Sequence, residues 1–273
     1  MLSYLTSPYS IDPQSEMIMN KIFLSLLFSL SSICLAPPTS QASPIFTGEI
    51  THKSVDEFIS KYDGLRDIKE IIIFSQGGEV GASIKLGQWV YKKNLDVVVR
   101  TMCYSGCANY VFVAGRKKIL EPDAFVAWHG DVEQKDFREL ARKYEEISSR
   151  KEKSKISKTD QLFLETNKNK YRTIKVLGRS QAELYSKLKL NSEFGRIGQE
   201  PVNYPSDGWI LTKKAMAHFG ILNVVVPDNY ATVEYLSATP LPAFINGGPF
   251  VILDVDNSGN IIPVNLAQIN GSR

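Results

Sequence analysis

Cysteine and histidine are scarce in this sequence, which limits the metal chemistry it can support. The 273 residues include three Cys and three His. No His and no third Cys lie near Cys103 and Cys107, so this pair lacks the ligand set of a zinc site. The stretch beginning at Asp254 starts like a calcium loop, but its twelfth position holds Asn265 instead of an acidic residue. We therefore predict no metal centre and no cofactor.

A long hydrophobic run is lacking as well. The apolar stretch 22–36 is about half a dozen residues short of a comfortable membrane span. It follows Met19 and Lys21, and it precedes a proline pair and a small-x-small run ending at Ala42. This order is typical of a secretory signal peptide, which predicts cleavage after about Ala42 and a periplasmic or secreted protein. Within the predicted signal peptide (1–42), residues 1–18 are open to a second interpretation, an artefact of start-site choice.

Strong net charge is also missing, since the formal charge is +3. The segment 135–190 nevertheless carries 16 Lys and Arg against 8 Asp and Glu. Its apolar residues have helical spacing, which predicts long amphipathic helices interrupted near 154–159. Aromatic residues are not interleaved with the basic ones as stacking platforms would be. We therefore interpret the charge as a solvated helix face and predict no nucleic-acid partner.

The segment 69–130 alternates the patterns of strands and helices. Strands are predicted at 71–74, 95–100 and 124–128, and helices at 80–91 and 106–114, with Asn94 and Gly115 as stop signals. This order favours an α/β domain with a mainly parallel sheet. Further on, a helix is predicted at 212–219, closed by Gly220 and followed by a strand, and a β-hairpin around 257–260. We expect a domain at 43–230 with a helical insertion at about 133–190, then a C-terminal extension at 231–273.

Ser105 has the setting of a nucleophile in such a fold. It follows a predicted strand and opens a helix, so its hydroxyl faces the carboxyl edge of the sheet. The N–H groups of Gly106 and of Gly78, at the preceding strand-to-helix turn, can form a two-donor oxyanion hole. A serine also needs a base, and His129 ends the next predicted strand.

Three stretches match the motifs of one known family. Residues 75–80 read SQGGEV where the family has S-P-G-G-x-V. Residues 102–108 read MCYSGCA at the turn that carries the family's nucleophile, and VAGRKKILEPDAFVAWH, 113–129, follows its pattern with a one-residue deletion. The chain thus resembles the Clp protease proteolytic subunit family of the ClpP/crotonase superfamily, well over 69–130 and loosely over 207–226. Its Cys-x-Ser-x-Cys variant is similar to a group of predicted periplasmic Clp-protease-like proteins.

The resemblance implies a fold of repeated β-β-α units and a set of site residues. Ser105 matches the nucleophile, His129 the base, and Gly78 and Gly106 the oxyanion donors. Gln76 departs from the family by replacing the proline before the glycine pair. The basic helices and the hairpin tail have no counterpart in the family.

The acidic member of a triad has two candidates. The family's register, counted back from the helix at 212–219, lands on Gly208, and Asp207 lies one residue earlier. Asp131, two residues after His129, is the second candidate. Asp207 also has the alternative role of capping a turn.

Cys103 and Cys107 also keep two interpretations. In an oxidising compartment they can form a disulfide, although residues four apart lie near the upper end of bridgeable separation. Two small buried thiols explain them equally well.

The predicted function is that of a serine peptidase acting outside the cytoplasm on peptides or unfolded protein. Clp proteases are fed by ATP-driven unfoldases, and a periplasm has no ATP, so none is expected as a partner. A homo-oligomer is compatible with this prediction. A catalytically inactive binding protein is the main alternative. A Ser–Lys peptidase using Lys117 or Lys118 and a crotonase-like acyl-CoA enzyme, whose cofactor is cytoplasmic, rank lower.

Overall fold

The computed structural model describes residues 42–150, 156–199, 208–239 and 250–264. The predicted signal peptide, apart from Ala42 at its end, and the candidate acid Asp207 lie outside these ranges. Among the helices described, none has both the length and the apolar character needed to cross a bilayer.

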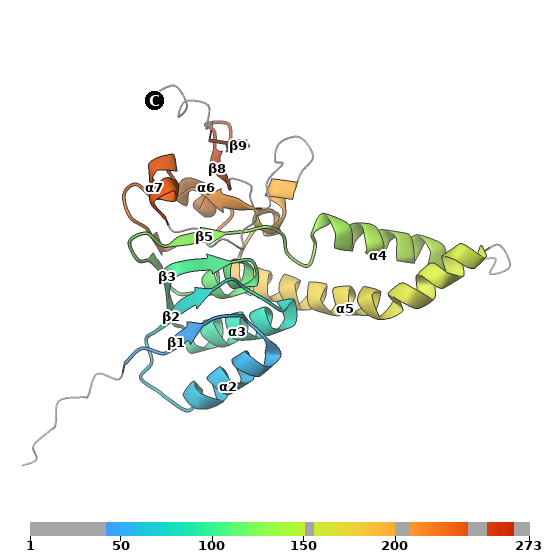
Figure 1. Cartoon of the computed structure of the whole chain (residues 1–273), viewed down its shortest axis with the longest axis horizontal. Helices are drawn as coiled ribbons and strands as arrows, with labels where there is room; N and C mark the ends of the chain where they lie inside the picture. The colour runs from blue at the N-terminus through green and yellow to red at the C-terminus, as the bar shows by residue number, and fades with distance from the viewer. Residues whose placement is uncertain (1–41, 151–155, 200–207, 240–249, 265–273) are drawn as a thin grey trace, which may run out of the picture. The chain divides into compact units, whose positions relative to one another are not determined.

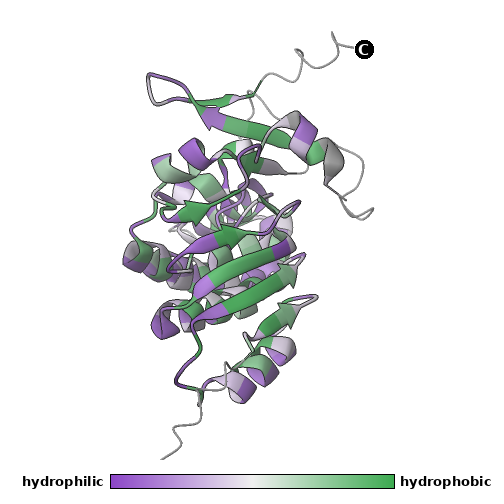
Figure 2. Cartoon of the chain, turned by 90° about the vertical axis from the view of Figure 1, so that its left-hand side faces the viewer, coloured by the Kyte–Doolittle hydropathy of each residue, from purple (hydrophilic) through white to green (hydrophobic). Residues whose placement is uncertain are grey.

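The main sheet is parallel throughout, as the alternating sequence pattern predicts. Its strand order is β1-β2-β3-β4-β7, and β5 pairs with the end of β3. The strands are β1 (Ile45–Thr47), β2 (Glu70–Ser75), β3 (Asp96–Tyr104), β4 (Lys118–Leu120), β5 (Phe125–Ala127) and β7 (Val224–Val225). Alternate residues of β2 and β3 are fully buried, and the central strands are apolar along most of their length (Figure 2). The mixed α/β architecture with a mainly parallel sheet is therefore confirmed.

Helices follow the strands along the chain. They are α2 (His52–Tyr62), α3 (Val80–Lys93), the π-helix η1 (Cys107–Phe112), α6 (Lys213–His218) and α7 (Val233–Ala238). Helices α3 and η1 pack against each other beside the main sheet, whereas α6 packs on β6 (Trp209–Leu211) and β8 (Val251–Val255) of a second sheet. Helix α3 ends at Asn94, whose left-handed backbone (φ 54°) forms the predicted stop. Its Gly87 lies against the carbonyl of Tyr110 in η1, a contact that leaves no room for a Cβ.

Two basic helices leave the sheet as an antiparallel pair, α4 (Lys135–Ser148) and α5 (Lys158–Leu188) (Figure 1). The rings of Tyr144 and Tyr171 stack between them at 4.2 Å. Glu145 accepts hydrogen bonds from Tyr171 and from Lys175. The C-terminal part of α5 returns to the core, where Gln181 accepts a hydrogen bond from Tyr110. Much of the basic charge of this pair is solvent-exposed, as a solvated helix face requires.

A second sheet lies beside β5. It contains β6 (Trp209–Leu211), β8 (Val251–Val255) and β9 (Ile261–Pro263), in the order β6-β8-β9. β8 and β9 pair antiparallel. In the turn between them, the Asp256 carboxylate accepts hydrogen bonds from the N–H groups of Ser258 and Asn260. The Asp256 carboxylate therefore stabilises the turn between β8 and β9.

A glycine in the middle of α5 supplies a test of this packing. A Cβ added at Gly178 would meet no atom within 4 Å. We expect Gly178→Ala to raise the free energy of unfolding by about 0.5–1 kcal/mol, since alanine loses less backbone entropy in a helix. Gly87→Ala is the matched opposite, and we expect it to destabilise by about 1–3 kcal/mol through its clash with Tyr110. Urea unfolding of both variants measures the difference. A destabilised Gly178→Ala protein would contradict the described packing of α5.

Candidate active site

Ser105 occupies a sharp turn between β3 and η1. Its backbone is left-handed, with φ 57°, a conformation that costs a non-glycine residue about 1–3 kcal/mol. Two hydrogen bonds hold the turn: the Ser105 N–H donates to the carbonyl of Ala127 (3.1 Å), and the Asn109 N–H donates to the carbonyl of Ser105 (2.9 Å). The side chain is half-buried. The turn thus directs the hydroxyl away from the strand, at the carboxyl edge of the sheet.

A disulfide closes this turn. Cys103 and Cys107 are bonded to each other with a Cα–Cα distance of 5.3 Å, and both side chains are fully buried. The pair is bridgeable because Cys103 is in a strand and the chain reverses at Ser105. Of the two interpretations open at the level of sequence, the structure has the disulfide.

His129 lies directly opposite Ser105. Its Nε2 is 2.6 Å from the Oγ of Ser105. It follows β5 immediately after Trp128, whose backbone exchanges two hydrogen bonds with Trp209 of the second sheet. The ring of Tyr104 packs against the imidazole, with centroids 5.0 Å apart.

The backbone around His129 is held by two side-chain amides that the sequence patterns do not reveal. Asn109 of η1 donates to the carbonyl of Gly130 at 2.6 Å. Gln199, at the end of the short helix η4 (Ile197–Gln199), donates to the carbonyl of His129 at 2.8 Å and accepts from the N–H of Lys135. Since Gln199 is 70 residues away in the chain, its role could be found only from the folded structure.

The predicted oxyanion donors lie beside the same hydroxyl. Gly77 and Gly78 both have positive φ, 90° and 150°. A Cβ at Gly77 would come within 2.8 Å of both the Cβ of Ser105 and the N of Gly106, so glycine is required for the two turns to meet. Among the described turn and loop bonds of this site, neither the N–H of Gly78 nor that of Gly106 donates to another backbone carbonyl.

The buried hydroxyl of Ser75 shapes the glycine turn. It accepts a hydrogen bond from the N–H of Gly77 at 3.0 Å and donates to the carbonyl of Gly48 at 2.6 Å. This links β2, the glycine pair and the loop after β1. The serine of the SQGG motif is thus structural.

These elements line a small cavity that is open to solvent, and we name it the Ser105 cleft. Its volume is about 250 Å³. The residues that line it are Glu49, Gln76, Gly77, Gly78, Tyr104, Ser105 and His129. The structure therefore brings together Ser105, His129 and Gly78, with Gly106 next to Ser105 in the chain.

Asp131 is buried close to His129 but turned toward other partners. Its Oδ1 accepts from the N–H of Glu133 at 2.8 Å, and its Oδ2 has no hydrogen-bond partner in the described ranges and packs against Gly195. Burial raises the pKa of this carboxyl from 3.8 to about 7. Within the described residues, no hydrogen bond joins the Asp131 carboxyl to the His129 imidazole.

Lys118 is far from the cleft. β4 pairs with β3 so that Lys118 is opposite Val97, roughly 23 Å of strand before Tyr104 at about 3.3 Å per residue. Its ammonium donates to the carbonyl of Leu222, and burial lowers its pKa to about 8. The pairing of β4 with β3 therefore places Lys118, and Lys117 beside it, far from Ser105.

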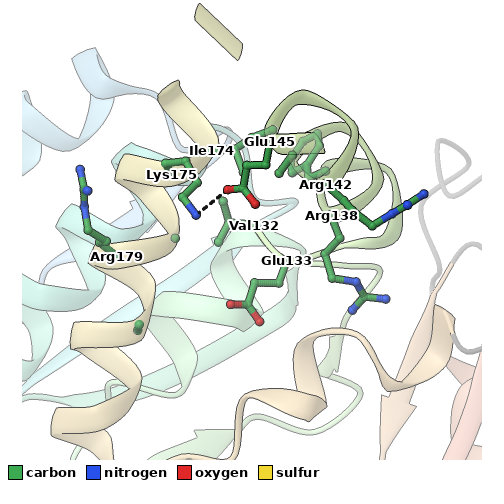
Figure 3. Close-up of a pocket in the computed structure, with 12 residues that line it drawn as sticks. Val132, Glu133, Arg138, Arg142, Glu145, Ile174, Lys175 and Arg179 are labelled. Atoms are coloured by element: carbon green, nitrogen blue, oxygen red, sulfur yellow. Dashed lines mark hydrogen bonds and ion pairs between the residues drawn. The ribbon is translucent and has the colours of Figure 1, made fainter. Parts of the chain in front are cut away.

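A second, larger cavity lies between α4 and α5, with a volume of about 470 Å³. Figure 3 shows Glu145 and Lys175 directed toward each other across it, whereas Arg142 and Arg179 point away. Ser105 and His129 do not line it. No group of three or more Cys, His, Asp or Glu side chains with metal-binding geometry occurs among the described residues.

Comparisons with known proteins add one structural likeness. No protein-family model and no curated protein matches this sequence. Among solved structures, the chain is similar to a mutant of ClpP1 from Listeria monocytogenes, with a TM-score of 0.40 and 17% identity. The match covers 71% of this chain and 94% of that chain.

The disulfide predicts a redox dependence of stability. For a loop this short, a crosslink is worth about 2 kcal/mol through the entropy of the unfolded chain. We expect dithiothreitol to lower the free energy of unfolding of the protein by about this amount in urea titrations. The double variant Cys103→Ala/Cys107→Ala is the control and should not respond to reductant. An equal response of both proteins would exclude the crosslink as the cause.

Asp131 predicts a pH dependence of stability. Because its pKa is raised in the folded state, the folded protein binds this proton more tightly than the unfolded chain does. The contribution of Asp131 is therefore most favourable below about pH 4 and is lost as the pH rises to about 7. We expect the stability of Asp131→Asn relative to the parent protein to rise progressively between pH 4 and 8, by up to about 4 kcal/mol.

Urea unfolding at pH 5 and pH 8 measures this difference. Asp67→Asn removes an exposed carboxyl and serves as the control. A stability difference between Asp131→Asn and the parent that stays constant over this range would contradict the account of the buried carboxyl.

Proposed function

We propose that this protein is a serine peptidase with Ser105 as nucleophile and His129 as base. The observation that carries the proposal is the 2.6 Å distance between Ser105 Oγ and His129 Nε2. This is within the reach that proton transfer to a general base requires. The left-handed turn and its two backbone hydrogen bonds hold the hydroxyl in this position before any substrate binds.

The chemistry follows from this geometry. As Ser105 Oγ attacks a peptide carbonyl, His129 Nε2 accepts the hydroxyl proton, and the carbonyl oxygen becomes negatively charged. The N–H groups of Gly78 and Gly106 donate to this oxyanion. The imidazolium then gives its proton to the leaving amine, and a water activated by the same imidazole hydrolyses the acyl-enzyme.

We assign the orientation of His129 to Asp207. The support is the family register, which places the acid next to this position. Asp207 lies outside the described residues. Asp131 is the weaker candidate, because its carboxylate binds the N–H of Glu133 and packs against Gly195.

The proposed site of action is outside the cytoplasm, on peptides or unfolded protein and without an ATP-driven unfoldase. The apolar run and small-x-small pattern at 22–42 support export. The Cys103–Cys107 disulfide supports it independently, since cytosolic thiols are generally kept reduced. The small volume of the Ser105 cleft suits one side chain of a flexible chain segment.

Reaction with a fluorophosphonate probe tests the proposal. We expect the protein to be labelled covalently, Ser105→Ala to abolish labelling, and His129→Ala to slow it about 10²- to 10⁴-fold, the usual contribution of a general base. Gel fluorescence after timed incubation measures the rates.

Ser157→Ala, at the N-cap of α5, removes a serine far from the cleft and is the control. Labelling that survives in Ser105→Ala would assign the reaction to another residue. A folded protein with no labelling in either redox state of the disulfide would favour the inactive binding protein.

A further inference from the structure

We infer that Glu49 makes the Ser105 cleft selective for peptides with a lysine or arginine side chain next to the scissile bond. The inference rests on the proposed function and deepens it by naming a substrate class. It starts from the lining of the cleft, in which Glu49 is the one charged carboxylate among the described residues.

The backbone on both sides of Glu49 is fixed. The Gly48 N–H donates to the carbonyl of Phe74 at 3.0 Å, and the Ile50 N–H donates to the carbonyl of Gly77 at 2.8 Å. The hydroxyl of Ser75 binds the carbonyl of Gly48. The backbone of Glu49 is thus attached to the same turn that carries the predicted oxyanion donors, and its side chain extends from this fixed point into the lining of the cleft.

The charge of Glu49 is not compensated by the described residues. None of their Lys, Arg or His side chains forms an ion pair or hydrogen bond with its carboxylate. The neighbouring carboxylate, Glu79, is engaged: it accepts from the backbone N–H of His52 at 2.8 Å and faces the imidazole of that residue. Among its described lining residues, the cleft therefore has one available carboxylate and no Lys or Arg side chain.

The remaining walls suit a cationic side chain. Gln76 contributes an exposed amide, and Tyr104 contributes an aromatic ring. A guanidinium can bind a carboxylate with two parallel hydrogen bonds and stack on an aromatic face. A small neutral or acidic side chain gains neither contact. Because Glu49 is exposed to solvent, the selectivity it confers should be moderate.

Two matched peptides test this inference. Acetyl-Ala-Arg-aminocoumarin and its citrulline analogue have nearly the same shape and differ in charge. We expect the protein to cleave the arginine peptide with a kcat/KM about three- to tenfold higher, and added salt to reduce this ratio. Glu49→Gln should bring the ratio to about one, and Glu49→Lys should invert the preference in favour of a glutamate peptide.

Glu57→Gln is the control, because it removes an exposed carboxylate from α2 that does not line the cleft. It should keep the arginine preference of the parent. Free and acetylated N-termini distinguish a side-chain cation from a terminal ammonium: the inference requires the preference in the acetylated peptides. An arginine-to-citrulline ratio that Glu49→Gln leaves unchanged, or a ratio near one in the parent, would overturn the inference.

A binding measurement separates this inference from the proposed function. Fluorescein-labelled arginine and citrulline peptides are titrated into Ser105→Ala and into Ser105→Ala/Glu49→Gln, where no turnover is required. Tighter binding of the arginine peptide that depends on Glu49 supports the inference even if fluorophosphonate labelling fails. Equal binding of both peptides overturns it even if Ser105 is reactive.

Discussion

The left-handed turn at Ser105 determines where the other residues of the candidate site must lie. A strand that ends in this conformation must reverse at once, and the reversal puts the hydroxyl in front of the sheet edge and not in line with β3. The backbone bond to Ala127 ties the turn to β5, and the disulfide between Cys103 and Cys107 closes it. Gly77 makes room for the turn by having no Cβ. Three features thus stabilise the strained backbone of Ser105: the bond to β5, the disulfide, and the space left by Gly77.

The second sheet and the short helix η4 hold the backbone around His129 in place. Trp209 of β6 exchanges backbone hydrogen bonds with Trp128, directly before the imidazole. Gln199 of η4 binds the carbonyl of His129 itself. These supports come from parts of the chain far from the serine motif. They keep the imidazole within 2.6 Å of a hydroxyl that the main sheet positions from the opposite side.

The elements that the sequence predicts well are those with local signals. The apolar strand run, the SQGG turn and the stop at Asn94 are all found where periodicity and turn chemistry predict them. The sequence pattern predicts a helix after Ser105 but not its π winding, because the run Cys107–Phe112 fits an α-helix equally well. No local pattern predicts the short strand at Lys118, because its register depends on pairing with β3 and β7. The contributions of Glu49 and Gln199 also arise only when distant segments meet.

Ser105 is proposed to attack a carbonyl whose oxygen then accepts hydrogen bonds from the glycine turn. A crystal structure of the protein with a peptide boronic acid can show this attack, because boron forms a tetrahedral adduct with a reactive serine. We expect a bond from boron to Ser105 Oγ, with one boron oxygen within hydrogen-bond distance of the N–H groups of Gly78 and Gly106. A boronate bound elsewhere, or an adduct whose oxygens both face solvent, would contradict it.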